Sequence, residues 1–460
     1  MLWSDTGSSR PHGAGCSGGR HPDLTAAHDH GSDAVTDFDT IDFFRDKSIV
    51  ADPYPYFDRL RDECPVRREP HHGVFMVTGY DEACAVYHDT ATFSSCNSVT
   101  GPFPGFSVPL EGDDVSDIVE QYRDELPFSD QLPTFDPPKH KAHRGLLMRL
   151  LTPKRLRENE EFMWRRADRQ IDTFGERGAC EFVGDYAKPF TLYVVAELLG
   201  VPESEHETFR EELQGGHRPD QALGSTGDAT LGHTPLEFLY GRFSDYVEER
   251  RREPREDVLT GLATATFPDG STPEVIDVVR VATNLFSAGQ DTTVRLLTTA
   301  LQLIAERPDL GQLLRDERER IPDFVEECLR IESPVKGDFR LARVATQVGG
   351  VDIPAGATVM VLNGAANRDP RRFEDPGEFQ VERQNSREHL TFGRGIHACP
   401  GGPLARSEAR VSLERLLDRM GDIRISEAEH GPAGARRFRY DPTFILRGLT
   451  RLHLEFEPVG

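Results

Sequence analysis

The chain has 460 residues, of which 37% are hydrophobic, and this is enough for a sizeable folded core. Acidic residues outnumber basic residues by 78 to 54, which argues against nucleic acid or an anionic membrane as a partner, because both require a basic face. No segment approaches the ~18 consecutive apolar residues that cross a bilayer. The first residues also lack the apolar block of a secretion signal, so we expect a cytoplasmic protein.

The N-terminal segment, residues 1–35, is rich in glycine, serine, histidine and aspartate and shows no apolar periodicity. Such a composition is typical of a disordered tail. Residues 36–460 are predicted to form a single domain. Within it, an irregular stretch from Ser94 to Pro138 alternates proline, glycine and phenylalanine, and a loop of this length in a compact domain is typical of a functional lid.

The apolar spacing in the second half of the chain predicts one long, mostly buried helix. Apolar residues recur at i, i+3, i+4 and i+7 from Val278 to Ile304, which is the helical period. Strand-like segments are short and few: Gly73 to Thr78, Val351 to Val361 and Phe444 to Phe456. The fold class is therefore predicted to be mainly α, with small sheets.

The middle of this long helix breaks the local rules. Residues 288–293 read Ala-Gly-Gln-Asp-Thr-Thr, although glycine costs ~1 kcal/mol in a helix relative to alanine, and Asp and Thr compete for backbone hydrogen bonds. Either the segment has a function, or Gly289 permits close packing beside a surface Asp291 and Thr292. A second motif, Glu327 with Arg330 at i+3, is by itself typical of a solvated ion pair.

The strongest single motif surrounds one cysteine. The chain has seven cysteines, widely spread and without a Cys-x-x-Cys pair, which disfavours a disulfide framework and a zinc ribbon. Cys399, however, lies in the glycine-rich segment Phe392 to Gly401, just before a predicted helix. Glycines let a loop approach a flat ligand closely, and the positive end of the helix favours a thiolate. The pattern indicates an anionic sulfur that binds a metal, with a structural buried cysteine as the alternative.

Together and in this order, these motifs resemble those of the cytochromes P450, the haem-thiolate monooxygenases, in their soluble bacterial form. The resemblance extends from about Asp37 to the end of the chain. It implies a triangular, mainly helical domain with small β-sheets that binds haem b (iron protoporphyrin IX). By the same resemblance, Cys399 is the axial ligand of the iron, and Phe392 and Gly401 belong to the haem-binding loop.

The resemblance also implies roles for residues that composition alone does not single out. Asp291 and Thr292 match the acid and the hydroxyl that deliver protons for O–O cleavage. Glu327, Arg330 and Arg383 match a structural set. Four basic residues match the partners of the haem propionates, which need cations or hydrogen-bond donors once they are buried; they are His140, Arg144, Arg340 and His397.

The implied reaction inserts one atom of O₂ into a C–H bond or a double bond of a hydrophobic small molecule. Because the chain shows neither a flavin module nor an iron–sulfur cysteine cluster, electrons from NAD(P)H must come through separate proteins, a ferredoxin reductase and a ferredoxin. The basic stretch from Pro137 to Arg157, which contains no acid, is expected to dock the ferredoxin. We expect a monomer. Three alternatives remain: a peroxide-driven relative, a haem protein that binds a gas or ligand without turnover, and a helical scaffold without a cofactor.

By resemblance, four parts of the chain should line the substrate pocket: the lid, the long helix, the segment after the Glu327 helix, and the C-terminal hairpin. The residues expected there are Phe103, Phe106, Val108, Leu285, Ala288, Val335, Phe339, Phe444 and Ile445. This set is apolar and aromatic. It favours a terpenoid, steroid, fatty acid or aromatic substrate without choosing among them.

Overall fold

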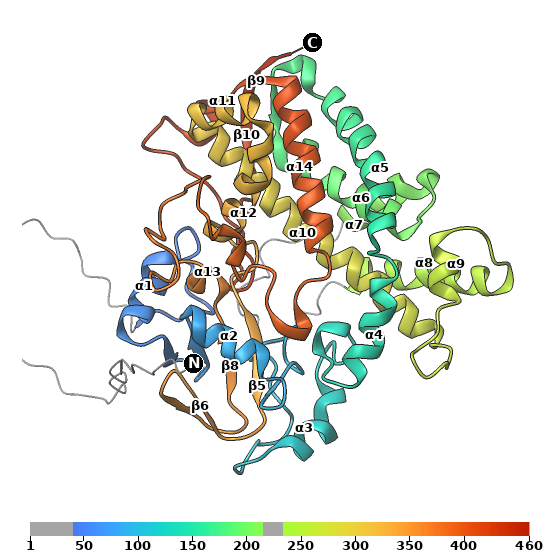
Figure 1. The fold of residues 1–460 in the computed structure, drawn as a ribbon, viewed down its shortest axis with the longest axis vertical. Helices are drawn as coiled ribbons and strands as arrows, with labels where there is room; N and C mark the ends of the chain where they lie inside the picture. Colours follow the sequence, from blue (N-terminus) through green and yellow to red (C-terminus); the bar gives the residue numbers. More distant parts are fainter. Residues whose placement is uncertain (1–39, 215–232, 460) are drawn as a thin grey trace, which may run out of the picture.

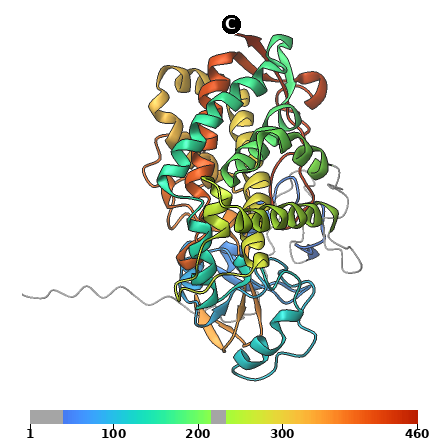
Figure 2. The ribbon, with the colours of Figure 1, turned by 90° about the vertical axis from the view of Figure 1, so that its right-hand side faces the viewer.

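The computed structural model describes residues 40–214 and 233–459, and Figure 1 shows their arrangement. Helices fill one end of the molecule, and small sheets with short helices fill the other; Figure 2 shows the same division from the side. The predicted mainly helical fold with small sheets is confirmed. The predicted tail, residues 1–35, lies outside the described residues, and the single domain over 36–460 stays a prediction.

The long helix α10 (Val275–Glu306) forms the centre of the helical part. It begins with a capping box, in which Glu274 and Asp277 satisfy backbone N–H groups of the first turn. The helix continues without interruption through the weak segment 288–293. A Cβ on Gly289 would lie 3.3 Å from Val195 Cγ2, so this glycine lets a neighbouring helix approach closely. Tertiary packing thus overrides the poor helix propensity of the segment.

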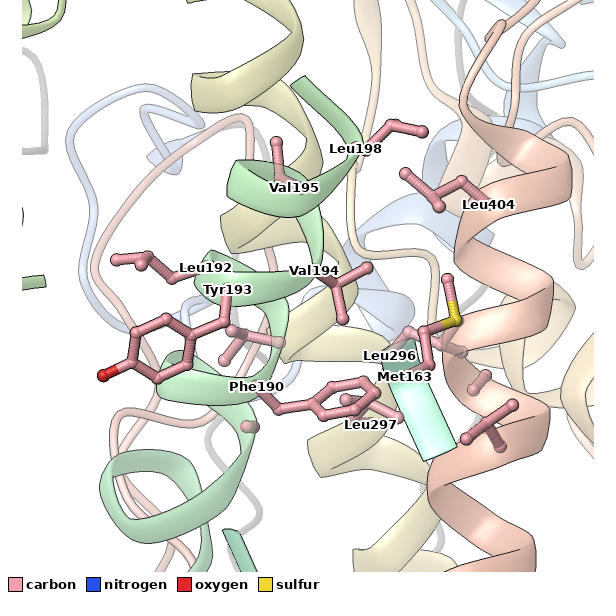
Figure 3. Close-up of a cluster of buried hydrophobic side chains, with 14 of the residues drawn as sticks. Met163, Phe190, Leu192, Tyr193, Val194, Val195, Leu198, Leu296, Leu297 and Leu404 are labelled. Atoms are coloured by element: carbon pink, nitrogen blue, oxygen red, sulfur yellow. The ribbon is translucent and has the colours of Figure 1, made fainter. Parts of the chain in front are cut away.

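That neighbour is α6 (Lys188–Leu199), which is apolar on all sides and almost completely buried. It packs against α10 and α5 (Pro153–Asp172), and α14 (Gly402–Arg419) packs against both of these. Figure 3 shows Val194 and Leu198 of α6 close to Met163 of α5 and Leu404 of α14. All these side chains are at most 3% exposed. Each buried aliphatic chain contributes about 1.5–3 kcal/mol, so this helical core fixes the position of α10.

A five-stranded sheet forms the other part of the frame, with strand order β1-β2-β8-β5-β3. Its strand β5 (Asp338–Ala342) is central to the site and pairs antiparallel with β8, so that Arg340 lies opposite Val359. A three-stranded sheet and a two-stranded hairpin complete the strands. The remaining strands are β1 (Val66–Arg68), β2 (Phe75–Val77), β3 (Phe93–Ser94), β4 (Ala179–Glu181), β6 (Thr346–Val348), β7 (Val351–Ile353), β8 (Thr358–Val361), β9 (Met420–Ile425) and β10 (His453–Pro458).

Two predicted strands differ from the structure. The stretch from Val351 to Val361 is divided into β7 and β8 by a turn that contains Gly356 at φ +80°. The stretch from Phe444 is mostly a loop, held by isolated bridges such as Val335 to Leu446, and only its end becomes β10. In both, apolar residues pack against neighbours in loop conformation, which strand propensity cannot distinguish.

The other helices surround this frame and connect its parts. Their bounds are α1 (Tyr54–Glu63), α2 (Tyr80–His88), α3 (Ser116–Tyr122), α4 (Lys139–Met148), α7 (His206–Gln214), α8 (His233–Arg252), α9 (Val258–Ala263), α11 (Pro308–Asp316), α12 (Ile321–Ile331), α13 (Asn363–Ala366) and α15 (Glu427–His430). The predicted lid therefore contains a helix, α3, within its irregular chain. None of the helices in the described part combines the length and apolarity needed to span a membrane.

Candidate active site

A cavity opens where α10, α4, the strand β5 and the loop before α14 meet. Its empty volume is about 1210 Å³, counted with its open mouth. Both Cys399 and Thr292 line it, and most of its wall is apolar.

The cysteine loop is built by glycines. Gly393 and Gly395 have φ of +63° and +69°, and a Cβ on Gly395 would lie 2.5 Å from the Tyr87 carbonyl oxygen, so no other residue fits there. The loop is closed by the Cys399 N–H, which donates to the Phe392 carbonyl at 2.7 Å. Cys399 thereby presents its side chain to the cavity, just before the N-terminus of α14.

The surroundings of the sulfur act on its ionisation in opposite directions. Burial in the protein raises the pKa of the Cys399 thiol, while the N–H groups of Gly401 and Gly402 and the Arg144 guanidinium lower it. Pro400, which lies between Cys399 and Gly401 in the chain, has no N–H that could point at the sulfur. Two backbone donors and the positive end of a helix therefore face the sulfur, as a thiolate requires.

Four basic side chains converge on the same cavity. His140 and Arg144 lie one turn apart on α4, Arg340 lies on β5, and His397 lies in the cysteine loop. The rings of His140 and His397 have centroids 4.0 Å apart, and Arg144 Nη2 donates to the Ala398 carbonyl at 2.5 Å. His140 Nε2 is buried without a hydrogen-bond partner among the described residues. The sequence thus placed these four residues in one site.

The four basic side chains have too little negative charge around them to keep both histidines protonated. Burial, with the charge of Arg144 next, lowers the pKa of His140 to about 4, and burial with the charge of Arg340 lowers the pKa of His397 to about 3. Asp136 opposes both shifts but does not offset them. Carboxylates of a ligand bound between these groups would stabilise their charged forms and satisfy the orphaned His140 nitrogen.

Thr292 and Asp291 lie side by side on α10, at the level of the cavity. The Thr292 hydroxyl lines the cavity and donates to the Ala288 carbonyl at 2.9 Å, one turn earlier in the helix. Asp291 is half-buried and does not belong to the cavity lining. The hydroxyl is therefore the group of this pair that a bound ligand would meet first.

Glu327, Arg330 and Arg383 form one buried ion cluster. Arg330 donates to both carboxylate oxygens of Glu327, at 2.7 and 2.8 Å, and Arg383 donates to the same carboxylate at 3.0 Å. Both arginines also bind carbonyls in the segment 367–378. The cluster fixes this segment to α12. The short-range pattern favoured a solvated pair, whereas Arg330 and Glu327 are 0% exposed.

A neighbouring cluster escaped the sequence analysis. Glu326 accepts hydrogen bonds from Arg406 at 2.5 and 2.9 Å and from His389 at 3.1 Å, and the Arg406 guanidinium lies over the ring of Phe392. This chain of contacts supports the cysteine loop from behind. Its only signal in the sequence is the position of Glu326 beside Glu327, which does not reveal a long-range partner.

The predicted pocket residues divide into two groups. Ala288 and Val335 line the cavity. The other seven lie outside its lining, and the main reason is aromatic packing with residues that sequence spacing does not bring together. Phe103, Phe339 and Phe444 surround the ring of Phe44, with centroids 5.3 to 6.4 Å from it. Ile445 packs on the same cluster, Phe106 packs near α3, Leu285 is buried in the helical core, and Val108 is half-buried in the loop.

The actual wall uses other residues of the same elements. They are Tyr87, Ser98, Leu132, Pro133, Leu147, Asn284, Thr293, Leu296, Leu329, Pro334, Asp338, Thr391, Gly393, Pro400 and Ala405, together with the residues named above. Helical spacing predicts that Asn284, Ala288 and Thr292 share a face, which is a signal that the choice of Leu285 overlooked.

Comparison with known proteins identifies the class to which this site belongs. Residues 237–420 match the family model "Cytochrome P450". The chain is 32% identical over 440 residues to Cytochrome P450 144 of Mycobacterium tuberculosis, covering 95% of this chain and 96% of that protein. It is also 32% identical to 6-deoxyerythronolide B hydroxylase of Saccharopolyspora erythraea, over 91% of this chain and 99% of that protein.

The structure of Mycobacterium marinum cytochrome P450 CYP150A6 in the substrate-free form is similar throughout. It shares 57% identity with this chain at a TM-score of 0.87, covering 92% of this chain and 100% of that one. The chain therefore belongs to the cytochrome P450 family and is a bacterial P450 monooxygenase with a haem-thiolate cofactor. The resemblance inferred from the sequence is confirmed.

The residues present fit haem b. The cavity offers one cysteine among the described residues, close-packed glycines for a flat ring, and a cluster of cations with an unpartnered buried nitrogen where two propionates need partners. The iron, the flat ring and the propionates of haem b would therefore each find residues of suitable chemistry in this cavity.

Proposed function

We propose that this protein hydroxylates or epoxidises a hydrophobic small molecule, with electrons from NAD(P)H delivered by a ferredoxin reductase and a ferredoxin. The observation that carries the proposal is that Cys399 and the Thr292 hydroxyl line the same, mostly apolar cavity. When haem b is bound there, it supplies the activation of O₂, and thiolate donation favours O–O cleavage.

The protein's own residues would bind the haem and keep the frame around it rigid. Cys399 would supply the sulfur ligand of the haem iron, with the charge of its thiolate stabilised by the N–H groups of Gly401 and Gly402. His140, Arg144, Arg340 and His397 would bind the propionates. Glu327 with Arg330 and Arg383 would keep the surrounding frame rigid.

Proton supply would follow from Thr292 and Asp291. A hydroxyl in the cavity wall can hold a water or donate a hydrogen bond where bulk water is excluded, and the neighbouring carboxylate can renew the proton. A peroxide-driven relative or a ligand-binding haem protein has less use for this pair. The pair therefore favours a monooxygenase that uses O₂.

The substrate is proposed to be an apolar small molecule, because the lining of the cavity is mostly apolar. The relative from Saccharopolyspora erythraea is named 6-deoxyerythronolide B hydroxylase, and hydroxylation is one of the two reactions proposed for this protein. A screen of terpenoids, steroids, fatty acids and aromatics for the low-to-high-spin shift of the ferric Soret band would find candidates. Substrate-dependent NAD(P)H consumption with ¹⁸O₂ incorporated into product is the expected result, and binding without turnover would support the ligand-binding alternative.

The basic stretch before and within α4 is proposed to dock the ferredoxin. Lys139, Lys141 and Arg149 are exposed, whereas Arg155 is half-buried and donates to the Leu198 carbonyl at 3.0 Å, so its reversal would also disturb packing. We expect Lys139→Glu, Lys141→Glu and Arg149→Glu together to slow reduction by ferredoxin at least about tenfold at low salt and to flatten its salt dependence. Stopped-flow reduction measures this.

The control for this prediction is Arg424→Glu, an exposed position on β9 at the far end of the molecule from α4 (Figure 1). It should leave the rate unchanged. A triple variant that is reduced at the wild-type rate would exclude α4 as the docking site.

Pro400 provides a second test of the thiolate's environment. A proline can serve as a helix starter, but α14 begins at Gly402 with Pro403 in its first turn, so that role belongs to Pro403. Fewer hydrogen bonds leave the sulfur richer in electrons. We expect Pro400→Leu to raise the ferric/ferrous reduction potential and the C–O stretching frequency of the ferrous CO complex. Pro403→Leu is the matched control, and equal values in wild type and Pro400→Leu would contradict the prediction.

A further inference from the structure

Asn284 is a polar residue of the cavity wall to which the proposed function gives no role. It lies on α10, one turn before Ala288 and two turns before Thr292, and it lines the same cavity as both of them. Its neighbours Leu285 and Phe286 are buried in the apolar core. Asparagine is a weak helix former that competes for backbone hydrogen bonds, so its presence here has a cost. A use inside the cavity would account for it.

The amide of Asn284 is available to a ligand. The side chain is half-buried, and its amide makes no hydrogen bond with any residue that the structure describes. An asparagine amide has one acceptor oxygen and two N–H donors. Because Asn284 lines the cavity, a molecule bound there can use these groups. Polar groups in a largely apolar wall are the ones that fix the orientation of a ligand.

The other uncharged polar groups of the wall already have partners in the protein. Hydroxyls that donate to a protein acceptor belong to Tyr87, Ser98, Thr292 and Thr391. The Thr293 hydroxyl interacts with the Glu408 carboxyl. The basic side chains of the wall form the cluster that would bind the propionates. Outside that cluster, Asn284 is therefore the polar residue of the described lining with its hydrogen-bonding capacity unused.

The lid is fastened to α10 one turn before Asn284. Arg280 of α10 forms an ion pair with Asp130 of the lid. The short helical turn that follows, Leu132–Thr134, is in contact with α10, and its first two residues line the cavity. A leucine and a proline of the lid therefore provide an apolar wall close to the Asn284 amide. A hydrogen bond in such surroundings is shielded from competing water.

The charges near this amide favour an uncharged oxygen on the ligand. An ionised carboxylate is costly to bury unless a cation accompanies it. Arg280 is paired with Asp130 and does not belong to the cavity lining, and the cations of the lining are those of the propionate cluster. The oxygen of a ketone, an ester or an alcohol can instead pair with the amide without any charge.

Helix geometry relates this amide to the proposed reacting end of the cavity. An α-helix rises ~1.5 Å per residue, so Asn284 and Thr292 are about 12 Å apart along the axis of α10. The proposed function places the proton supply at Thr292. A molecule held by Asn284 would therefore present to that end a carbon far from its own oxygen.

We propose that Asn284 is a specificity-determining residue, whose amide binds a neutral ketone, ester or alcohol oxygen at the end of an apolar substrate remote from the carbon that is oxidised. Oxygenated terpenoids and steroids satisfy this requirement. Fatty acids do not, because their carboxylate would find no cation at this end. The position of the oxidised carbon rests on the proposed monooxygenase function, whereas the hydrogen bond to a ligand in the cavity does not.

A series of 1-alkylimidazoles tests the hydrogen bond without turnover, because imidazole binds ferric haem and shifts its Soret band. The probes have chains of graded length that end in a methyl, a hydroxyl or a carboxylate group. Titration of the haem-loaded protein gives the Kd of each probe. At the length that reaches Asn284, the ratio of the methyl-ended to the hydroxyl-ended Kd should be about two- to tenfold larger in wild type than in Asn284→Leu.

Leucine is the better helix former, so Asn284→Leu should keep α10 intact. The matched control is Gln302→Leu, which also replaces an amide of α10 but lies outside the cavity lining, where Gln302 donates to Glu306 at 3.2 Å. It should leave every ratio unchanged. An equal ratio in wild type and Asn284→Leu at all chain lengths would overturn the proposal. Tightest binding of the carboxylate-ended probe, lost in Asn284→Leu, would overturn the neutral class of ligand.

Product analysis separates this proposal from the proposed function. For a ketone or alcohol that the protein turns over, Asn284→Leu should raise KM severalfold and spread oxidation over neighbouring carbons, because one end of the molecule is no longer held. An unchanged product distribution would overturn the positioning role of Asn284. If no compound is turned over while the imidazole series still depends on Asn284, the proposed function fails and the hydrogen bond stands.

Discussion

Cys399→His is expected to abolish the strongly red-shifted Soret band of the ferrous CO complex. The band requires an electron-rich thiolate as a ligand of the haem iron, and a neutral imidazole would donate less charge to the iron. Cys399 is the cysteine of the described residues that lines the cavity, and the donors that face its sulfur come from the backbone, which the substitution leaves intact. The loop should therefore keep its shape while the ligand changes.

The measurement is the CO difference spectrum of the reduced, haem-loaded variant. Cys84→Ser is a suitable control, because Cys84 is a half-buried cysteine on α2 outside the cavity lining and its replacement should keep the full band. A band that persists in Cys399→His would reassign the ligand to another cysteine.

The sequence predicts best those features that depend on short-range spacing. The helix from Val278 to Ile304 agrees with α10 within a few residues, because its apolar period is continuous over many turns. The cysteine loop was recognisable because Gly393 and Gly395 need positive φ, a requirement that leaves a visible mark on the sequence. The class of enzyme followed from the resemblance of these motifs, in this order along the chain, to those of the cytochromes P450.

Features that depend on long-range packing were not accessible in this way. Phe339 and Phe444 are apolar and close to the site in sequence order, but they turn to the ring of Phe44, a partner about 300 or more residues earlier. Whether an aromatic side chain lines a cavity or fills a core depends on which strand or loop packs opposite, and periodicity does not contain that information.

Glu408 illustrates the same limit for a charged residue. Between Arg406 and Arg410 on a helix, it has the sequence surroundings of a surface ion pair. Both arginines instead bind other acids, Arg406 binding Glu326 and Arg410 binding Glu160 and Glu414. Glu408 faces the helical interior, so its burial becomes apparent only when the packing of α14 on α10 is known.

The last prediction concerns Thr292. Thr292→Ala should preserve substrate binding but direct electrons into peroxide, because the cavity loses the hydroxyl that holds and passes protons. Groups that transfer protons in this manner contribute about 10²–10⁴-fold to rates, so we expect product per NAD(P)H to fall at least about tenfold while NAD(P)H consumption continues. Thr292→Ser, which keeps the hydroxyl, should recover most of the coupling.

Thr298→Ala separates this chemistry from an effect on the helix. The Thr298 hydroxyl donates to the Val294 carbonyl at 2.7 Å, as the Thr292 hydroxyl donates to that of Ala288, but Thr298 is buried outside the cavity lining. Both variants lose the same type of bond within α10, and only one loses a hydroxyl from the cavity. Equal coupling in the two variants would show that Thr292 acts on the helix alone, whereas peroxide formation confined to Thr292→Ala, with an unchanged spin shift on substrate binding, places the hydroxyl in the proton supply.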